Sequence, residues 1–407
     1  MAGPLSHIRV LDLSRVLAGP WASQNLADLG AEVIKIERPG SGDDSRAFGP
    51  PWVKDAQGRD TKDSAYFTSA NRGKKSITLN IAAPEGQAIV RELAAASDVL
   101  IENYKYGDLG RYGLGYADLH ALHPGLIYCS VTGFGQTGPY RERPGYDFMI
   151  QGMGGMMSVT GEPDDAPGGG PQRAGVPIAD IITGMYASIA ICAALAHRER
   201  SGEGQHLDLA LLDSQIALLA YQNTNYFATG VPPRRIGNLH PNIAPYQPFR
   251  AADGEVILAC GNDNLYRKFC EAAGCAELSR DPRFATNGKR VENRAELTRL
   301  LGEVFRKRSK REWLELLEAA GVPNGPINDV AQVFEEPQVK ARGVRIELGH
   351  AAAGKLPLVA SPMRFSGTPI EYRQAPPLLG EHTAEVLHRV LGKNEAEIAR
   401  LRAAGVI

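Results

Sequence analysis

Two hydrophobic periods alternate along the first hundred residues. Short apolar runs rich in β-branched residues predict buried strands, and they lie at 8–13, 32–36, 77–81 and 98–102. Between them, apolar positions recur on one face of a helix, and these segments are 20–29 and 84–96. Alternating strands and helices are typical of a parallel sheet that helices cover on both sides. We therefore expect an α/β fold with a doubly wound sheet.

The second half of the chain predicts a change of architecture. Apolar periodicity predicts a helix at 181–198, a strand at 206–211 and a helix at 212–228. Residues 230–250 contain five prolines and are typical of a linker, whereas 255–325 is mainly helical. The last eighty residues return to short strands and a helical hairpin, so we expect them to rejoin the first domain. The expected ranges are a large domain at 1–225, a small helix-rich domain at 226–328 and a returning segment at 329–407.

Composition narrows the class of protein. A chain of 407 residues is long enough for two domains. Its 45 basic and 46 acidic residues give no bulk electrostatic reason to expect nucleic acid or membrane as a partner. Five cysteines without CxxC spacing fit a reduced compartment better than a disulfide framework or a zinc ribbon. Because the N-terminus lacks a signal sequence and polar residues interrupt the apolar stretch 178–196, we expect a cytoplasmic protein.

Two loops bear on the kind of ligand. Residues 14–19 follow the first strand, at the edge where parallel sheets bind ligands, but they contain no GxGxxG motif. The sequence GFGQTG at 133–138 does match that motif, yet Pro139 and Pro144 prolong a loop where a dinucleotide site needs a helix. Residues 38–64 form a further long loop, a length that is often functional. We therefore expect a ligand at the sheet edge that is not a dinucleotide.

Basic residues cluster at strand ends and in the loops after them. Such loops meet at one edge of a doubly wound sheet, where they could bind the phosphates of a nucleotide. Surface lysines are more often solvated than bound to a ligand, and that alternative stays open. The candidates are Arg38, Arg72, Lys74, Lys75 and Lys105.

One carboxylate, Asp180, stands in apolar company between Ala179 and Ile181. It could be the N-cap of a helix that begins near Ile181, or it could be a reactive carboxylate held at that helix end. Glycines crowd the preceding loop at 168–175. The chain contains no GxSxG, HExxH or P-loop motif, so hydrolase, zinc-protease and kinase chemistry lack support, and His240 has a structural explanation at least as good as a functional one.

Several stretches together resemble the class III CoA-transferases, which include formyl-CoA transferase and carnitine CoA-transferase. They are LDLSRVLAGP (11–20), GAEVIKIERPGSGDDSR (30–46), NRGKKSITLN (71–80), ENYKYG (102–107) with GLGY (113–116), TGFGQTGPY (132–140) with RPGYD (143–147), PIADIITGMYA (177–187), GVPNGPI (321–327) and LLGEHTAEVL (378–387). The resemblance covers nearly the whole chain. It implies a large Rossmann-like domain made of both chain ends, a small α+β domain, and a homodimer of interlocked rings.

The resemblance also implies a mechanism. An aspartate at the position of Asp180 attacks the thioester of a donor acyl-CoA, and a mixed anhydride and then an aspartyl-CoA thioester form before the acceptor acid is activated. Coenzyme A thioesters are then substrates, and no prosthetic group is implied. Such intermediates survive only where water is excluded, which apolar neighbours and a closing glycine loop could achieve. A helix N-terminus would favour the ionised carboxylate that the attack requires.

By position, the resemblance implies a set of CoA-binding residues from several loops. Residues 16–18 in the first loop would touch the CoA moiety. Arg38 and residues 71–75 would bind its phosphates and adenine, and Asn103, Tyr104 and Arg111 would form the adjoining wall of the site. Lys105 and Tyr106 stand where many relatives have Arg and Pro. The implied CoA-binding residues are Val16, Leu17, Ala18, Arg38, Asn71, Arg72, Lys74, Lys75, Asn103, Tyr104, Arg111 and Tyr146.

The sequence around Arg15 and Arg46 resembles most the succinyl-CoA:glutarate branch of the family. A guanidinium can hold a distal carboxylate bidentately, so we expect these arginines to bind a C4–C6 dicarboxylate. The alternative is that they pair with Asp28, Asp43 or Asp44 within the protein.

Other reactions also occur on this fold. An α-methylacyl-CoA racemase would need a histidine where this chain has Tyr146, so proton transfer is disfavoured. Formyl-CoA/oxalate or carnitine-type transfer, and a catalytically silent CoA-binding protein, stay open as alternatives.

Overall fold

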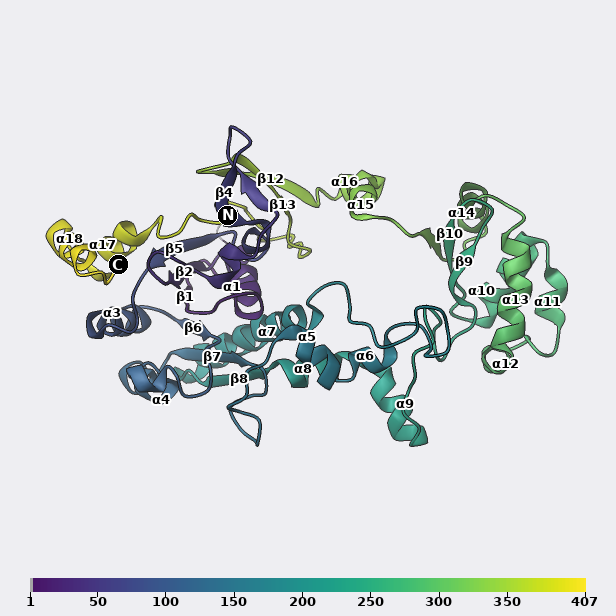
Figure 1. Ribbon diagram of the computed structural model, residues 1–407, viewed down its shortest axis with the longest axis horizontal. Helices are drawn as coiled ribbons and strands as arrows, with labels where there is room; N and C mark the ends of the chain where they lie inside the picture. The colour runs from purple at the N-terminus through teal and green to yellow at the C-terminus, as the bar shows by residue number, and fades with distance from the viewer. Residues whose placement is uncertain (1–2) are drawn as a thin grey trace. The chain divides into compact units, whose positions relative to one another are not determined.

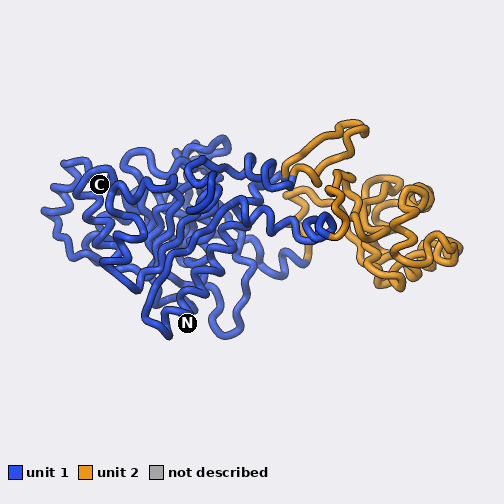
Figure 2. Tube along the Cα trace, turned by 90° about the horizontal axis from the view of Figure 1, so that it is seen from below, with its two compact units in different colours: residues 1–156, 174–227, 338–407 blue, residues 157–173, 228–337 orange. Residues whose placement is uncertain are grey.

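A computed structural model describes residues 3–407. The chain forms two compact units, coloured blue and orange in Figure 2. Of the described residues, the large unit comprises 3–156, 174–227 and 338–407, and the small unit comprises 157–173 and 228–337. Residues 157–173, which precede Asp180 in the chain, therefore belong to the small unit, whereas the expected large domain at 1–225 included them.

A six-stranded parallel sheet forms the centre of the large unit (Figure 1). Its strands are β1 (Arg9–Asp12), β2 (Glu32–Glu37), β5 (Lys74–Thr78), β6 (Val99–Glu102), β7 (Ile127–Thr132) and β8 (His206–Ala210). They lie in the order β5-β2-β1-β6-β7-β8, and every neighbouring pair is parallel. The expected α/β class with a parallel sheet is confirmed. Because the order reverses between β1 and β6, the loops after these strands diverge and leave room for a ligand.

Helices pack on both faces of this sheet. Within each strand, alternate side chains point to opposite faces, so that Leu11 enters one core cluster and Val10 the other. On the Leu11 side lie α3 (Pro84–Ala95), α4 (Tyr116–Leu122), α17 (Thr383–Leu391) and α18 (Glu395–Ala403). On the Val10 side lie α1 (Ala18–Asp28), α5 (Asp147–Met153), α7 (Ile178–Ser201) and α8 (Leu211–Leu218). The sheet is therefore doubly wound, as the periodicity predicts.

Helix α7 packs against α1 across a very short gap. A side chain at Gly184 would lie 2.6 Å from the carbonyl oxygen of Ala18, so only glycine permits this approach. By length and composition alone, α7 is the one helix among residues 3–407 that could cross a membrane. In this fold, Ala187, Ile191 and Leu195 of α7 are buried in the core cluster that α1 also joins.

Several predicted boundaries were wrong. Strand β5 begins at Lys74, three residues before the predicted start. The apolar pattern missed Lys74 and Ser76 because they are polar, although both are buried. The predicted loop at 38–64 contains a 3-10 turn, η1 (Asp44–Ala47), and a hairpin of β3 (Trp52–Lys54) with β4 (Asp60–Ser64). The predicted helix at 212–228 is broken at Ala220, whose φ is 45°, into α8 and α9 (Tyr221–Thr229).

The small unit combines a three-stranded antiparallel sheet with helices. Its strands are β9 (Tyr246–Arg250), β10 (Glu255–Ala259) and β11 (Asn324–Pro326), and β9 falls in the predicted linker. Its main helices are α10 (Asp263–Ala273), α11 (Ala276–Arg280), α12 (Asn287–Glu292), α13 (Arg294–Phe305) and α14 (Lys310–Ala319). Stacked aromatic rings fill its core, with Phe305 centred 4.6 Å from Phe249 and 4.4 Å from Trp313.

The shorter elements complete the chain. They are α2 (Ala65–Thr68), η2 (Gly110–Tyr112), α6 (Met156–Val159), α15 (Val330–Glu335), α16 (Pro337–Ala341) and the antiparallel pair β12 (Arg345–His350) and β13 (Gly354–Val359).

Candidate active site

A pocket lies at the carboxyl edge of the sheet in the large unit, where the strand order reverses. The loops after β1, β6 and β7 and the first turn of α7 form its walls. It brings together nine of the residues expected at the site, which are Arg15, Val16, Leu17, Ala18, Asn103, Tyr104, Lys105, Tyr146 and Asp180. It also contains residues that sequence reasoning did not assign, namely Asp44, Arg141 and Arg143.

Asp180 is not a helix cap. Helix α7 begins at Ile178 with Pro177 as N-cap, so Asp180 is the third residue of the first turn. Instead the carboxylate of Asp147 accepts the N–H of Ala179 at 2.8 Å and that of Asp180 at 3.4 Å. The capping alternative for Asp180 was therefore wrong, because a carboxylate 33 residues earlier in the chain takes that role.

The Asp180 carboxyl lies in an environment that favours its neutral form. Within residues 3–407 the Asp180 carboxylate accepts no hydrogen bond, and it lines the pocket. Burial, followed by the nearby charge of Asp147, raises the pKa of Asp180 to about 7. The carboxyl thus changes its charge near neutral pH, as is typical of functional groups.

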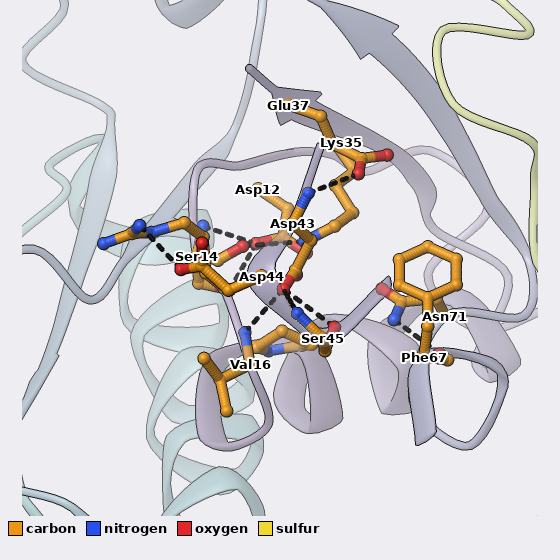
Figure 3. Close-up of polar contacts among 12 residues, drawn as sticks. Asp12, Ser14, Val16, Lys35, Glu37, Asp43, Asp44, Ser45, Phe67 and Asn71 are labelled. Carbon is orange, nitrogen blue, oxygen red and sulfur yellow. Dashed lines mark hydrogen bonds and ion pairs between the residues drawn. The ribbon is translucent and has the colours of Figure 1, made fainter. Parts of the chain in front are cut away.

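The loop after β1 is held in a strained conformation. Val16 has a φ of 70°, in the left-handed region that β-branched residues avoid. Its N–H donates to Asp43 at 3.0 Å, as Figure 3 shows, and the side chain of Asn103 bonds to both the N–H and the carbonyl of Arg15. These contacts fix the loop that forms one wall of the pocket.

A buried ionic network lies beside this loop and bonds to it (Figure 3). Lys35 contacts Asp43 at 2.8 Å and donates to the carbonyl of Ser14 at 2.7 Å, and it is fully buried. Although burial by itself favours the neutral acid, Lys35 and the backbone donors hold the pKa of Asp43 well below its usual range. Lys74, 3.2 Å from Asp12, is also fully buried, and burial lowers the pKa of Lys74 to about 8.

Several residues expected to bind CoA or substrate lie away from this pocket. Arg46 is buried and contacts Glu37 at 2.7 Å and Asp63 at 2.6 Å, so the expected carboxylate clamp is occupied by the protein's own acids. Of the others, Asn71 bonds to Lys74, Arg72 pairs with Asp28, Lys75 pairs with Glu385, and Arg111 pairs with Asp108 on the surface.

Arg38 lines a second pocket of the large unit, at the ends of β2 and β5. This pocket shares Arg15 and Tyr104 with the pocket at Asp180, so the two are neighbours along the same sheet edge. The guanidinium of Arg15 lies over the Tyr104 ring, 5.2 Å from its centroid.

Arg143 belongs to the RPGYD segment, whose residue types signalled a site although this arginine was not singled out. Its guanidinium lies 4.4 Å from the ring centroid of Tyr140. The segment is seated closely on the end of β7, because a side chain at Gly145 would lie 2.4 Å from the Cα of Gly133. The GFGQTG loop thus shapes the pocket and, as predicted, opens no helix.

Comparison with known proteins identifies the family. The profile of CoA-transferase family III matches residues 5–383. The chain belongs to this family. It is 52% identical over 94% of its length to the succinate–glutarate CoA-transferase of Agrobacterium fabrum, of which 95% is covered. It is 45% identical over 99% of its length to the succinyl-CoA:glutarate CoA-transferase of Mus musculus, of which 90% is covered.

Among solved structures, a CAIB/BAIF family protein from Brucella suis is similar, with a TM-score of 0.83 and 51% identity. The match covers 96% of this chain and all of the Brucella chain. A CoA-transferase of family III uses CoA thioesters as substrates, and the pocket described above combines a carboxylate with several cations. This combination suits a reaction between a protein carboxylate and an anionic thioester.

Proposed function

We propose that this CoA-transferase moves CoA from succinyl-CoA to glutarate and that Asp180 is its nucleophile. The observation that carries the proposal is the similarity, over nearly the full length, to relatives whose names state this reaction. The position of Asp180 on the wall of a cation-rich pocket supports the second part.

The reaction proceeds through four transfers at carbonyl carbon. The Asp180 carboxylate attacks the thioester of succinyl-CoA, which expels CoA thiolate and leaves a mixed anhydride. The thiolate attacks the aspartyl carbonyl, so that succinate leaves and an aspartyl-CoA thioester remains. Glutarate attacks this thioester and forms a second anhydride with release of thiolate. The thiolate then attacks the glutaryl carbonyl, which gives glutaryl-CoA and restores Asp180.

The distal carboxylate of the acyl group requires a cation in the pocket. Arg15 lines the pocket and is partly balanced by Asp44, at 2.9 Å, whereas Arg46 is occupied by Glu37 and Asp63. We assign the distal carboxylate to Arg15 together with Arg143, because a planar guanidinium matches a carboxylate with two hydrogen bonds. Arg46 then acts only as a support for the neighbouring loop.

The CoA moiety is assigned to the adjoining pocket. Its phosphates carry several negative charges. Lys105 and Arg15 line the pocket at Asp180, and Arg15 and Arg38 line the adjoining pocket. Val16, Tyr104 and Asn103 also line the pocket at Asp180. Of the other expected CoA-binding residues, Asn71, Arg72 and Lys74 are buried in internal contacts and contribute to the shape of this edge.

We also propose a cytoplasmic homodimer of interlocked rings. Large apolar side chains of the large unit are exposed, including Met185 and Ile189 of α7 and Phe227 of α9, the last two being 63% and 76% exposed. Exposed apolar side chains of this size support an interface with a second copy of the chain. Light scattering coupled to size exclusion should give twice the mass of the chain, and a monomer at micromolar concentration would contradict the assignment.

The activity is tested by mass spectrometry of CoA products. Purified protein mixed with succinyl-CoA and ¹³C-labelled glutarate should produce labelled glutaryl-CoA, and the Asp180→Asn protein should not. Hydroxylamine added with succinyl-CoA alone should convert Asp180 to a hydroxamate, detected on the peptide. Glutaryl-CoA formation without modification of Asp180 would reject the nucleophile, whereas modification without glutaryl-CoA would reject the acceptor.

A further inference from the structure

We infer that Asp147 is a positioning residue for Asp180. Asp147 binds the N–H groups at the N-terminus of α7, and the Asp180 carboxylate is therefore left without backbone donors. The inference rests on the proposed role of Asp180 as nucleophile. Asp147 itself need not touch the substrate.

The N–H groups at the start of α7 all have partners. A helix leaves its first four N–H groups without partners inside the helix. In α7 the first of these positions is the N-cap Pro177, which has no N–H, so three groups remain. The N–H of Ile178 donates to the carbonyl of Val176 at 2.8 Å, and those of Ala179 and Asp180 donate to Asp147. All three are thus satisfied without the side chain of Asp180.

The residue before the helix cannot bind the Asp180 carboxylate. An acidic residue in the third helical position commonly reaches back to the N–H of the N-cap residue. The N-cap of α7 is Pro177, which has no N–H, so this local partner does not exist for Asp180. The carboxylate therefore points into the pocket without a competing backbone bond.

Asp147 is itself held in place by several contacts. It is the first residue of α5 and only 8% exposed. Its second oxygen accepts from the side-chain amide of Gln151 at 2.7 Å, and the carbonyl oxygen of that amide accepts the N–H of Ala174 at 2.8 Å. Asp147 therefore connects α5, the chain just before α7, and the first turn of α7.

The consequence is a carboxylate whose charge is set by its neighbours. After burial, Asp147 is the group that raises the pKa of Asp180. Burial and then the charge of Asp180 also raise the pKa of Tyr66 to about 12, so this phenol stays neutral. The cations Arg15, Lys105, Arg141 and Arg143 line the same pocket, but the shift in the pKa of Asp180 follows burial and the charge of Asp147. A carboxylate with a higher pKa and few donors is a stronger nucleophile.

The test replaces Asp147 with Asn, which keeps an oxygen for the N–H of Ala179 but removes the charge. The Asp180 carboxyl is followed by ¹³C NMR of aspartate-labelled protein and is assigned by its loss in Asp180→Asn. The expected result is a fall of about one pH unit in the Asp180 titration. The midpoint of kcat/KM against pH should move in the same direction. At pH 8, kcat should fall several-fold with little change in KM.

The matched control is Asp329→Asn in the small unit. Asp329 is also an acidic residue at a helix start, where its side chain accepts the N–H of Gln332 at 2.8 Å. The same chemical change there should leave both the Asp180 titration and kcat unchanged.

A second variant keeps the inference testable if Asp147→Asn does not fold. Pro177→Ala supplies an N–H at the N-cap, to which Asp180 can then bond, so the Asp180 titration should again move to lower pH and kcat should fall. If Asp147→Asn folds and the Asp180 titration does not shift, the inference is overturned. If Asp147→Asn does not fold, an unshifted Asp180 titration in Pro177→Ala overturns it. Absence of a hydroxylamine adduct at Asp180 in the parent protein would instead overturn the proposed function, whatever the titration shows.

Discussion

Two carboxylates near the same sheet edge, Asp43 and Asp180, have opposite surroundings. Asp43 contacts Lys35 and accepts the N–H groups of Val16 and Ser45, and these partners hold its pKa low. Asp180 accepts no hydrogen bond within residues 3–407, and burial followed by the charge of Asp147 raises its pKa. Asp43 is fully buried and Asp180 is half-buried, and their partners differ in kind.

The difference teaches that burial alone does not decide what a carboxylate does. A buried charge with complete partners fixes the backbone around it, as Asp43 fixes the strained loop at Val16. A buried carboxylate without partners is unstable as an anion and is available for reaction. We therefore regard Asp43 as part of the support and Asp180 as the reactive group.

The largest effect is expected for Asp180→Asn. Loss of the nucleophile should reduce kcat by at least about 10³-fold, because an amide cannot form the acyl intermediate. Thermal unfolding of the same variant checks that it is folded. If the variant keeps transferase activity within tenfold of the parent, Asp180 is not the reactive carboxylate and does not differ from Asp43 in that respect.

Asp43→Ala should act on stability instead. Removing Asp43 leaves Lys35 buried without its principal partner, which costs about 3–5 kcal/mol of unfolding free energy. The control is Asp60→Ala, which breaks an exposed ion pair with Lys54 and should cost only a small fraction of that. Urea denaturation measures both. Equal losses in the two variants would remove the distinction between supporting and solvent-exposed pairs.

The two carboxylates should also differ in the sign of their pH dependence. Because the pKa of Asp180 is raised to about 7, the folded protein binds more protons than the unfolded chain between about pH 4 and pH 7. Its stability relative to Asp180→Asn should therefore fall as pH rises through that window, by about 4 kcal/mol in total, since one pKa unit corresponds to about 1.4 kcal/mol. Asp43 acts in the opposite sense, since its stabilisation is present above about pH 4 and is lost only as pH falls below that.

Melting temperatures of the parent and of Asp180→Asn from pH 4 to pH 8 measure the first of these dependences. If the difference in melting temperature between the two proteins does not grow with pH, Asp180 is ionised as easily in the fold as in water.

The smallest effect concerns the loop that Asp43 holds. Val16→Gly removes the cost of a left-handed β-branched residue but adds the flexibility of glycine, so stability should rise by no more than about 1 kcal/mol. KM for succinyl-CoA should rise, because the Val16 side chain lines the pocket. A stability loss above about 1 kcal/mol would show that the side chain, and not the Asp43 bond, holds this loop.

The core of the fold could be predicted because the strands of a covered sheet are continuous apolar runs. The runs around Leu11, Ile34 and Leu100 became neighbouring parallel strands. Strand β5 was harder to delimit, since Lys74 and Ser76 are polar yet buried, and burial of a charge depends on partners that sequence periodicity does not contain.

The candidate site was predictable only in part for the same reason. Motif resemblance located Asp180 and the loop at Val16, which the structure brings to one pocket. Arg46 and Lys74 look like exposed anion-binding residues in the sequence, but Glu37 and Asp12 neutralise them across the sheet. The role of Asp147 was hidden because its bonds to α7 span more than thirty residues.

The aromatic stack of the small unit has an optical consequence. The chain contains three tryptophans, of which Trp313 lies in the small unit and Trp21 and Trp52 lie in the large one. Trp313 is fully buried against Phe305, so its emission should be blue-shifted while this core is intact. A chain with Trp21→Phe and Trp52→Phe would carry Trp313 as its single tryptophan, whose emission reports the unfolding of the small unit alone.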